Sequence, residues 1–242
     1  MNESLRKSKV YKGLRYIFRP VYLKILEIKY QKNSYGKEIN WNWGEINYNR
    51  IALVNLLIAK FKNASYLEIG CLSNKLFDSV PTKNKIGVDP VGGGTVKATS
   101  DNFFEENRIK FDVIFIDGLH TYEQVRRDVV NSLNSLNPGG WISLHDMLPR
   151  TWKEHHVPNL SPGPWTGDVW KVAFELIETK GVEFKIIEID NGVGVVKINS
   201  EYSGLNNKIS TLEKKQFDYF YEKKKQLPII SWEEAVEWID SK

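Results

Sequence analysis

The 242-residue sequence is poor in cysteine and contains no long apolar run. Its single cysteine, Cys71, excludes a disulfide framework and a cysteine-based zinc site, and such usage is typical of a reducing compartment. No apolar stretch approaches the roughly 20 residues needed to cross a bilayer. The apolar segment near the N-terminus is interrupted by Arg19, Pro20 and Lys24, unlike the continuous core of a signal peptide. We therefore expect a cytoplasmic protein.

Acidic residues are scarce at the N-terminus. Residues 1–37 contain ten Lys or Arg residues against two acids, Glu3 and Glu27, with aromatic residues between them. Such an arm suits an acidic surface such as anionic lipid or nucleic acid, or a phosphorylated or acidic acceptor. The alternative is a solvated helix that packs its aromatic side chains on the domain. We expect no sequence-specific nucleic-acid partner, whereas peripheral membrane contact through residues 1–37 and a homodimer both stay open.

From residue 46 the chain alternates helical and extended patterns. Short apolar strands are expected at "SYLEIG", "KIGVDP", "FDVIFIDG" and "GGWISLHD", and Asn191-Gly192 predicts a tight hairpin turn. Thr121 and Gln124 have capping-box spacing before a helix. This alternation predicts an α/β, Rossmann-like doubly wound and mostly parallel sheet in three layers, with an antiparallel edge hairpin. We expect a basic N-terminal extension (1–45), the sheet domain (46–200) and a helical C-terminal extension (201–242) packed on it.

Each of the four expected strands ends near an acidic residue. In open α/β sheets, ligands bind beyond the carboxyl ends of the strands. Acids crowded at that edge repel one another, and a ligand with hydroxyls, a cationic centre or a metal ion would relieve the repulsion. Glu68 and Asp89 lie 21 residues apart, the spacing at which an acid closing the second strand binds ribose hydroxyls. A Gly-x-Gly-x-x-Gly motif is absent, which disfavours a dinucleotide cofactor.

Several of these segments carry a family resemblance. "YLEIG", "IGVDP", "FDVIFIDGLHTYEQVRRDV" and "NPGGWISLHD" resemble successive motifs of class I S-adenosylmethionine-dependent methyltransferases. Over residues 50–200 the chain is most similar to a bacterial branch with Asp-Gly-x-His and His-Asp motifs, which resembles the metal-dependent O-methyltransferases. The resemblance implies the Rossmann-like fold, the cofactor S-adenosylmethionine and a set of cofactor-binding residues: Glu68, Gly70, Cys71, Asp89, Ser100, Asp101 and Asp117.

The same resemblance assigns these residues to parts of the cofactor. Glu68 and Gly70 would lie against its methionine part, and Asp89 would hold the ribose hydroxyls. Ser100 and Asp101 would lie near the adenine, although both also suit a helix N-cap.

Two histidines and two aspartates follow the third and fourth expected strands. Methyl transfer to a hydroxyl is helped by a general base or by a divalent cation. His120, with an ordinary pKa of about 6.5, suits the base, and the resemblance places the base at this position. Asp117, His145 and Asp146 suit a metal site for Mg²⁺ or Mn²⁺. The alternative is structural: Asp117 caps the turn with its carboxylate, His120 bonds a backbone carbonyl at a helix start, and His145-Asp146 is a structural pair.

The segment 147–171 is long for a connection between a strand and a helix, which is typical of active-site lids. Its Trp165, with Trp43 of "NWNWGE", would contact the acceptor. We expect O-methylation of a small-molecule or glycan acceptor, such as a sugar hydroxyl or a glycosylated bacterial product in polysaccharide biosynthesis. Two alternatives are a hydroxylase on the same fold and a non-catalytic cofactor-binding module docked through the basic arm.

Overall fold

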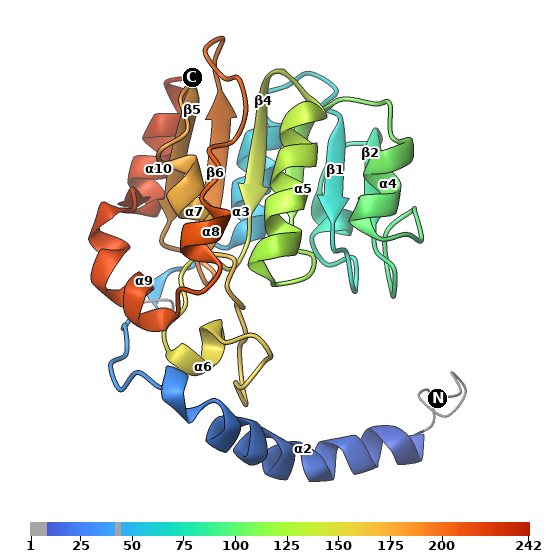
Figure 1. Ribbon diagram of the computed structural model, residues 1–242. Coiled ribbons are helices and arrows are strands. Elements are labelled where there is room, and N and C mark those ends of the chain that lie inside the picture. The colour runs from blue at the N-terminus through green and yellow to red at the C-terminus, as the bar shows by residue number, and fades with distance from the viewer. Residues whose placement is uncertain (1–8, 42–44) are drawn as a thin grey trace.

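One mixed sheet of seven strands forms the centre of the protein, in the order β2-β1-β3-β4-β6-β5-β7 (Figure 1). The computed structural model describes residues 9–41 and 45–242. The strands are β1 (Tyr66–Ile69), β2 (Lys85–Val88), β3 (Phe111–Ile116), β4 (Leu136–Leu144), β5 (Val182–Ile187), β6 (Val193–Ile198) and β7 (Ile229–Ile230). β1 to β4 are parallel, and β6 is antiparallel to both of its neighbours. The predicted Rossmann-like sheet with an antiparallel hairpin is confirmed, but the hairpin is not the edge of the sheet, because β7 pairs with β5 in parallel and forms the edge.

Helices cover both faces of this sheet. In Figure 1, α5 and α7 lie on one face, and α3 and α10 lie on the other. The helices are α2 (Lys9–Lys29), α3 (Arg50–Ile58), α4 (Ser100–Glu106), α5 (Tyr122–Asn134), α6 (Trp152–His155), α7 (Lys171–Leu176), α8 (Ile209–Leu212), α9 (Phe217–Lys223) and α10 (Trp232–Asp240), with short 3₁₀ turns η1 (Gln31–Asn33), η3 (Phe77–Ser79) and η4 (Lys224–Gln226). Among the described residues, no helix is both long enough and apolar enough to cross a bilayer.

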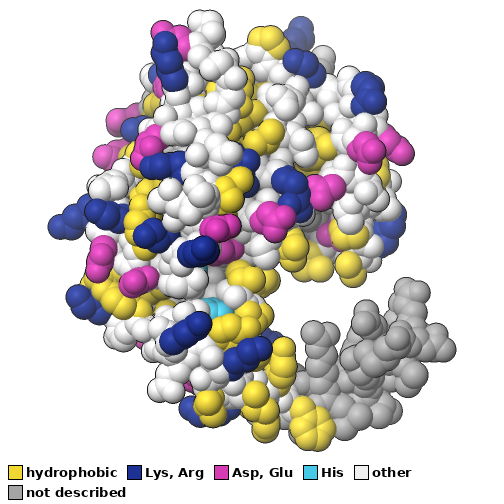
Figure 2. Space-filling model, viewed as in Figure 1, with side chains coloured by type: hydrophobic (Ala, Val, Ile, Leu, Met, Phe, Trp, Pro, Cys, Tyr) yellow, Lys and Arg dark blue, Asp and Glu magenta, His cyan; other side chains and the backbone are white. Residues whose placement is uncertain are grey.

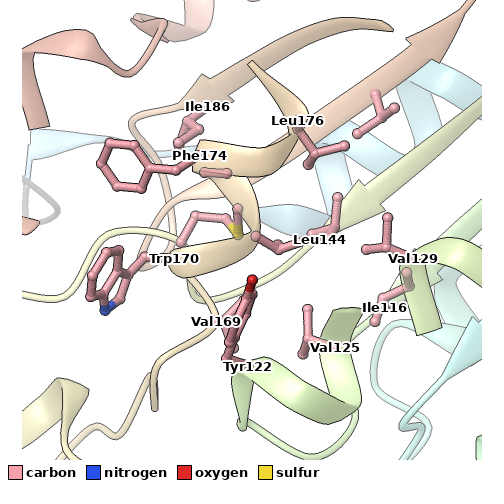
Figure 3. Close-up of a cluster of buried hydrophobic side chains, with 14 of the residues drawn as sticks. Ile116, Tyr122, Val125, Val129, Leu144, Val169, Trp170, Phe174, Leu176 and Ile186 are labelled. Atoms are coloured by element: carbon pink, nitrogen blue, oxygen red, sulfur yellow. The ribbon is translucent and has the colours of Figure 1, made fainter. Parts of the chain in front are cut away.

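The core is split by the sheet into two apolar layers. Successive strand side chains point to opposite faces, so Leu67 and Ile114 join the layer under α5 while Tyr66 and Val113 join the layer under α3. Figure 3 shows the α5 layer, where side chains of α5 and α7 meet the ends of β3 and β4. Both faces of the central strands are therefore buried, which explains their nearly continuous apolar sequences.

Local sequence signals were correct at some element ends and wrong at others. Asn191 and Gly192 take the positive φ angles of a tight turn between β5 and β6. Ser231 forms a complete capping box at the start of α10. The expected capping box of Thr121 is wrong, because its side chain makes no cap hydrogen bond. The carboxylate of Asp168, from the 147–171 segment, instead accepts a 2.6 Å hydrogen bond from the first backbone N–H of α5.

Candidate active site

A cavity of about 710 Å³ lies at the carboxyl ends of the parallel strands, within the range of about 300–1,000 Å³ usual for ligand pockets. From β1 the chain adds β2 on one side and β3 on the other. The cavity therefore lies at the point where strand order reverses, the place at which such sheets bind ligands. Its lining includes residues from all four strand ends: Gly70, Asp89, Asp117 and Asp146.

Gly70 allows the ends of β1 and β3 to meet under this cavity. Its φ is +89°, and a Cβ atom there would lie 2.1 Å from the carbonyl oxygen of Asp117. Any other residue would push the two strand ends apart, since both the conformation and the space suit only glycine. The glycine therefore positions Asp117 as well as the loop that follows β1.

Asp89 is fixed by backbone donors on the β1–β2 side of the cavity. One carboxylate oxygen accepts from the N–H groups of Val91 and Gly92 at 2.7 and 2.8 Å, and the other accepts from Leu72 at 2.8 Å. Burial disfavours the charged form, but these N–H groups outweigh it and lower the pKa of Asp89. A carboxylate offers about four acceptor positions, so Asp89 retains capacity for a ligand hydroxyl.

Glu68 and Cys71 lie beneath the cavity and are not among the described residues that line it. Glu68 is 2% exposed and accepts a 2.6 Å hydrogen bond from the hydroxyl of Tyr66. Burial, and then the charge of Asp117, raise the pKa of Glu68 to about 7. Direct contact of Glu68 or Cys71 with a cofactor therefore stays a prediction.

Ser100 and Asp101 line the cavity at the start of α4. The N-cap is the preceding Thr99, whose side chain accepts from the N–H of Asn102, so the alternative role of Ser100 or Asp101 as the cap is wrong. Gln124 donates to both residues, at 3.1 and 3.0 Å, which explains why it does not complete a capping box at α5. Their contact with an adenine stays a prediction.

On the β3–β4 side, two carboxylates and two imidazole rings converge. Nε2 of His120 lies 3.3 Å from Asp117 Oδ1, and its Nδ1 lies 3.1 Å from Asp146 Oδ2. Nδ1 of His145 lies 3.3 Å from Asp117 Oδ1 and 3.2 Å from Asp146 Oδ1. Asp146 takes φ +62°, a conformation that aspartate tolerates better than most residues. The structure thus brings together all four residues predicted from the two strand ends.

The hydrogen-bond partners fix which ring nitrogens carry protons. His145 Nε2 lies 3.0 Å from a guanidinium nitrogen of Arg50, which can only donate, so a neutral His145 carries its hydrogen on Nδ1, between the two carboxylates. His120 Nδ1 lies 2.9 Å from the carbonyl oxygen of Trp165, which can only accept. His120 Nε2 lies 3.3 Å from Asp117 Oδ1, so both ring nitrogens face acceptors, and the surroundings favour the doubly protonated ring.

Mutual attraction shifts the titration of this group. Although burial opposes both shifts, the two histidines hold the pKa of Asp117 well below its usual range, and the carboxylates of Asp117 and Asp146 raise the pKa of His120. Asp117, His120 and Asp146 each offer a ligand atom, and these atoms all lie within 4.8 Å of one another. Carboxylate and imidazole donors at this spacing suit a divalent cation.

The 147–171 segment closes over His120. Trp165 stacks on the His120 ring with centroids 5.2 Å apart and lines the cavity. Gly167 has φ +61°, and a Cβ atom there would lie 1.7 Å from the carbonyl oxygen of His120, so only glycine permits this approach. Trp43, the other predicted acceptor residue, lies outside the described residues.

The sequence did not predict Arg50 and Asp190, which lie beside His145. Arg50, the first residue of α3, and Asn191, in the β5–β6 turn, line the cavity. Arg50 forms a 2.8 Å ion pair with Asp190, and Asp190 also lies 3.6 Å from His145 Nε2. These residues are about 140 positions apart, so no local pattern could have linked them.

Part of the chain is similar to a known protein family. A family model described as a methyltransferase domain matches residues 82–147, which run from the start of β2 past Asp117, His120 and Asp146. Over these residues the chain is similar to a methyltransferase domain, and the sheet order and the position of the cavity are those of a Rossmann-like fold. No curated protein matches the chain at a significant level.

Solved structures with similar folds are distant in sequence. A protein of Corynebacterium glutamicum is 11% identical, with a TM-score of 0.48 over 80% of this chain and 99% of that one. An O-methyltransferase of Bacillus cereus, in complex with S-adenosylhomocysteine, is 14% identical, with a TM-score of 0.44 over 73% and 89%. A methyltransferase of Podospora anserina with the same ligand is 16% identical, with a TM-score of 0.47 over 73% and 95%.

Proposed function

We propose that the protein is a metal-assisted O-methyltransferase that methylates a hydroxyl group of a sugar or glycosylated product. The observation that carries this proposal is the convergence of Asp117, His120 and Asp146 in the same cavity that Asp89 and Gly70 line. A single cavity can then hold the methyl donor on the β1–β2 side and the acceptor on the β3–β4 side. The acceptor oxygen would then lie beside a general base and a bound cation, and each of these can make a hydroxyl nucleophilic.

Asp117 and Asp146 would hold a divalent cation, Mg²⁺ or Mn²⁺. A carboxylate oxygen of Asp117 and one of Asp146 lie within 4.8 Å of each other, and carboxylate oxygens are the ligands that these cations prefer. A bound cation lowers the pKa of a coordinated hydroxyl. His145 is the weakest of the three predicted ligands, because the proton that Arg50 imposes on Nδ1 occupies the nitrogen that faces the carboxylates.

His120 would take the proton from the acceptor. The Trp165 carbonyl oxygen holds Nδ1–H and fixes the ring, and Nε2, which lies 3.3 Å from Asp117 Oδ1, would be the nitrogen that accepts the proton. As the acceptor oxygen forms its bond to the methyl carbon, the carbon–sulfur bond of the sulfonium breaks. The products are a methyl ether, S-adenosylhomocysteine and a proton on His120.

Trp165 supports a sugar as acceptor. An aromatic ring at the wall of the cavity offers an apolar face to a pyranose, and the polar groups of Arg50 and Asn191 line the same cavity. The hydroxylase alternative predicts a product that depends on oxygen and a reductant, without release of S-adenosylhomocysteine.

The test is calorimetric titration with S-adenosylmethionine and S-adenosylhomocysteine, with and without Mn²⁺, followed by assay of S-adenosylhomocysteine release with free sugars and aryl glycosides. We expect both cofactor forms to bind, and release to fall in the presence of a chelator. Failure of both forms to bind would overturn the proposal. Full activity in chelator would overturn the role of the cation alone.

A further inference from the structure

Helix α2 exposes a continuous apolar stripe on its outer face. Phe18, Val21, Tyr22, Ile25 and Ile28 are each 57–65% exposed. Their spacing of three and one residues places them along one side of a helix with about 3.6 residues per turn. Single exposed apolar side chains are ordinary, but a contiguous stripe marks an interaction surface. Figure 2 shows these hydrophobic side chains gathered on the described part of α2, at the bottom of the view.

Positions of α2 beside and behind this stripe are held by the domain. Leu26 is buried in the main core layer, and Glu27 forms a 2.8 Å ion pair with Lys153 of α6. Just beyond the helix, the ring of Tyr30 packs on His156 with centroids 4.6 Å apart. α2 therefore has a defined inner face, and the apolar stripe is the face that the domain leaves uncovered. In Figure 1 the rest of the helix runs out from beneath the domain.

The charge of this arm favours an anionic partner. Residues 1–37 carry ten Lys or Arg residues and two acids. Glu27, the acid within α2, is already paired with Lys153 and lies 3.6 Å from Lys24, and the hydrogen bond from Lys153 lowers its pKa despite the opposing effect of burial. A second copy of this chain would bring the same positive charge against α2, which would oppose self-association through this face.

We propose that α2 lies in the plane of an anionic lipid bilayer and inserts its apolar stripe at the boundary of headgroups and acyl chains. An apolar stripe, flanking Lys and Arg residues and low overall hydrophobicity are the properties of such interfacial helices. The stripe supplies the buried apolar area, and the basic residues supply attraction to anionic headgroups. The helix would lie on the surface without crossing it.

Membrane contact would also reach the candidate active site. Arg19 donates a 3.3 Å hydrogen bond to the carbonyl oxygen of Ser161, and Asn33 lies 3.1 Å from His156. Ser161 and His156 belong to the 147–171 segment, which carries Trp165. Trp165, which lines the cavity, donates a 2.8 Å hydrogen bond from its indole N–H to the carbonyl oxygen of His156. Contacts from α2 and from the residues just after it therefore reach the cavity wall through the 147–171 segment, and a docked α2 would hold this wall beside the bilayer.

The test is flotation of the full-length protein with vesicles of phosphatidylcholine alone and of phosphatidylcholine mixed with phosphatidylglycerol. We expect binding to the mixed vesicles, weaker binding at high salt because exposed charges are screened, and little binding to phosphatidylcholine alone. Val21→Asp/Ile25→Asp should bind at least about tenfold more weakly, because both side chains lose apolar burial and gain charge. Lys29→Glu should reduce the preference for the anionic vesicles.

Ile109→Asp is the matched control, because Ile109 is 54% exposed and lies before β3, away from α2. It should bind vesicles like the unaltered protein. Circular dichroism and cofactor titration should be unchanged in every variant, which separates this proposal from the proposed enzymatic function. No binding to the mixed vesicles would overturn the proposal. Dissociation of a dimer by Val21→Asp/Ile25→Asp, without vesicle binding, would overturn it in favour of a second copy.

Discussion

The two sides of the cavity hold their carboxylates in different ways. On the β1–β2 side, Asp89 accepts from three backbone N–H groups at 2.7–2.8 Å. On the β3–β4 side, Asp117 and Asp146 face imidazole rings at 3.1–3.3 Å. Backbone donors keep their hydrogens at every pH, whereas an imidazole can gain or lose a proton, and the neighbouring carboxylates raise the pKa of both rings although burial opposes the shift. The β1–β2 side therefore suits a ligand of constant charge. The β3–β4 side suits reversible binding of a proton or a cation.

The largest expected effect is on His120. His120→Gln should lower the turnover number by about 10²–10⁴-fold, the usual contribution of a general base, with cofactor affinity unchanged. The measurement is the rate of S-adenosylhomocysteine release with a saturating hydroxyl acceptor. Mn²⁺ affinity, measured by electron paramagnetic resonance, separates two roles, since one ring nitrogen cannot both bind a cation and accept a proton. Unchanged Mn²⁺ affinity supports the base, and weakened affinity would show that His120 is a ligand instead.

The next effect concerns the carboxylates of the β3–β4 side. Asp146→Asn should weaken Mn²⁺ binding at least about 100-fold, since even changes to groups behind a metal ligand cost about 10–100-fold. Asparagine also tolerates the φ of +62° at this position, so the backbone should be preserved. Asp101→Asn is the control, because Asp101 lines the other side of the same cavity. Equal Mn²⁺ affinity in both variants would exclude Asp146 as a ligand.

The third effect concerns Glu68 of β1 and the pH dependence of protein stability. The folded pKa of Glu68, about 7, lies above that of the unfolded chain, so the folded state binds the extra proton between these values. Its contribution to stability is therefore present at low pH and is lost as the pH rises to about 7. In the unaltered protein, Glu68 should lower the free energy of unfolding by about 2–3 kcal/mol between pH 5 and pH 8. Glu68→Gln should not show this decrease. Urea unfolding across this pH range measures the difference, and parallel curves for the two proteins would contradict it.

The sequence predicts features that depend on neighbouring residues better than features that depend on residues far apart in the chain. The strands, the order of helices and strands, and the acids after each strand follow local periodicity, and the resemblance placed Asp117, His120 and Asp146 in one site. The pairing of Arg50 with His145 depends on α3 meeting the β5–β6 turn, which no local pattern encodes. The wrong capping box has the same cause, because Gln124 finds tertiary partners on α4 and Asp168 arrives from the 147–171 segment.

The smallest expected effect is on Asp89, and it completes the comparison. Asp89→Asn should weaken S-adenosylmethionine binding about tenfold, because a charged acceptor is lost and the amide NH₂ must face backbone N–H groups that now lack an acceptor. Calorimetric titration measures this, with exposed Asp78→Asn as the control. Mn²⁺ affinity should stay unchanged, just as S-adenosylmethionine affinity should in His120→Gln. If Asp89→Asn bound the cofactor normally, the three N–H groups would be holding a turn, and the β1–β2 side would not be the cofactor site.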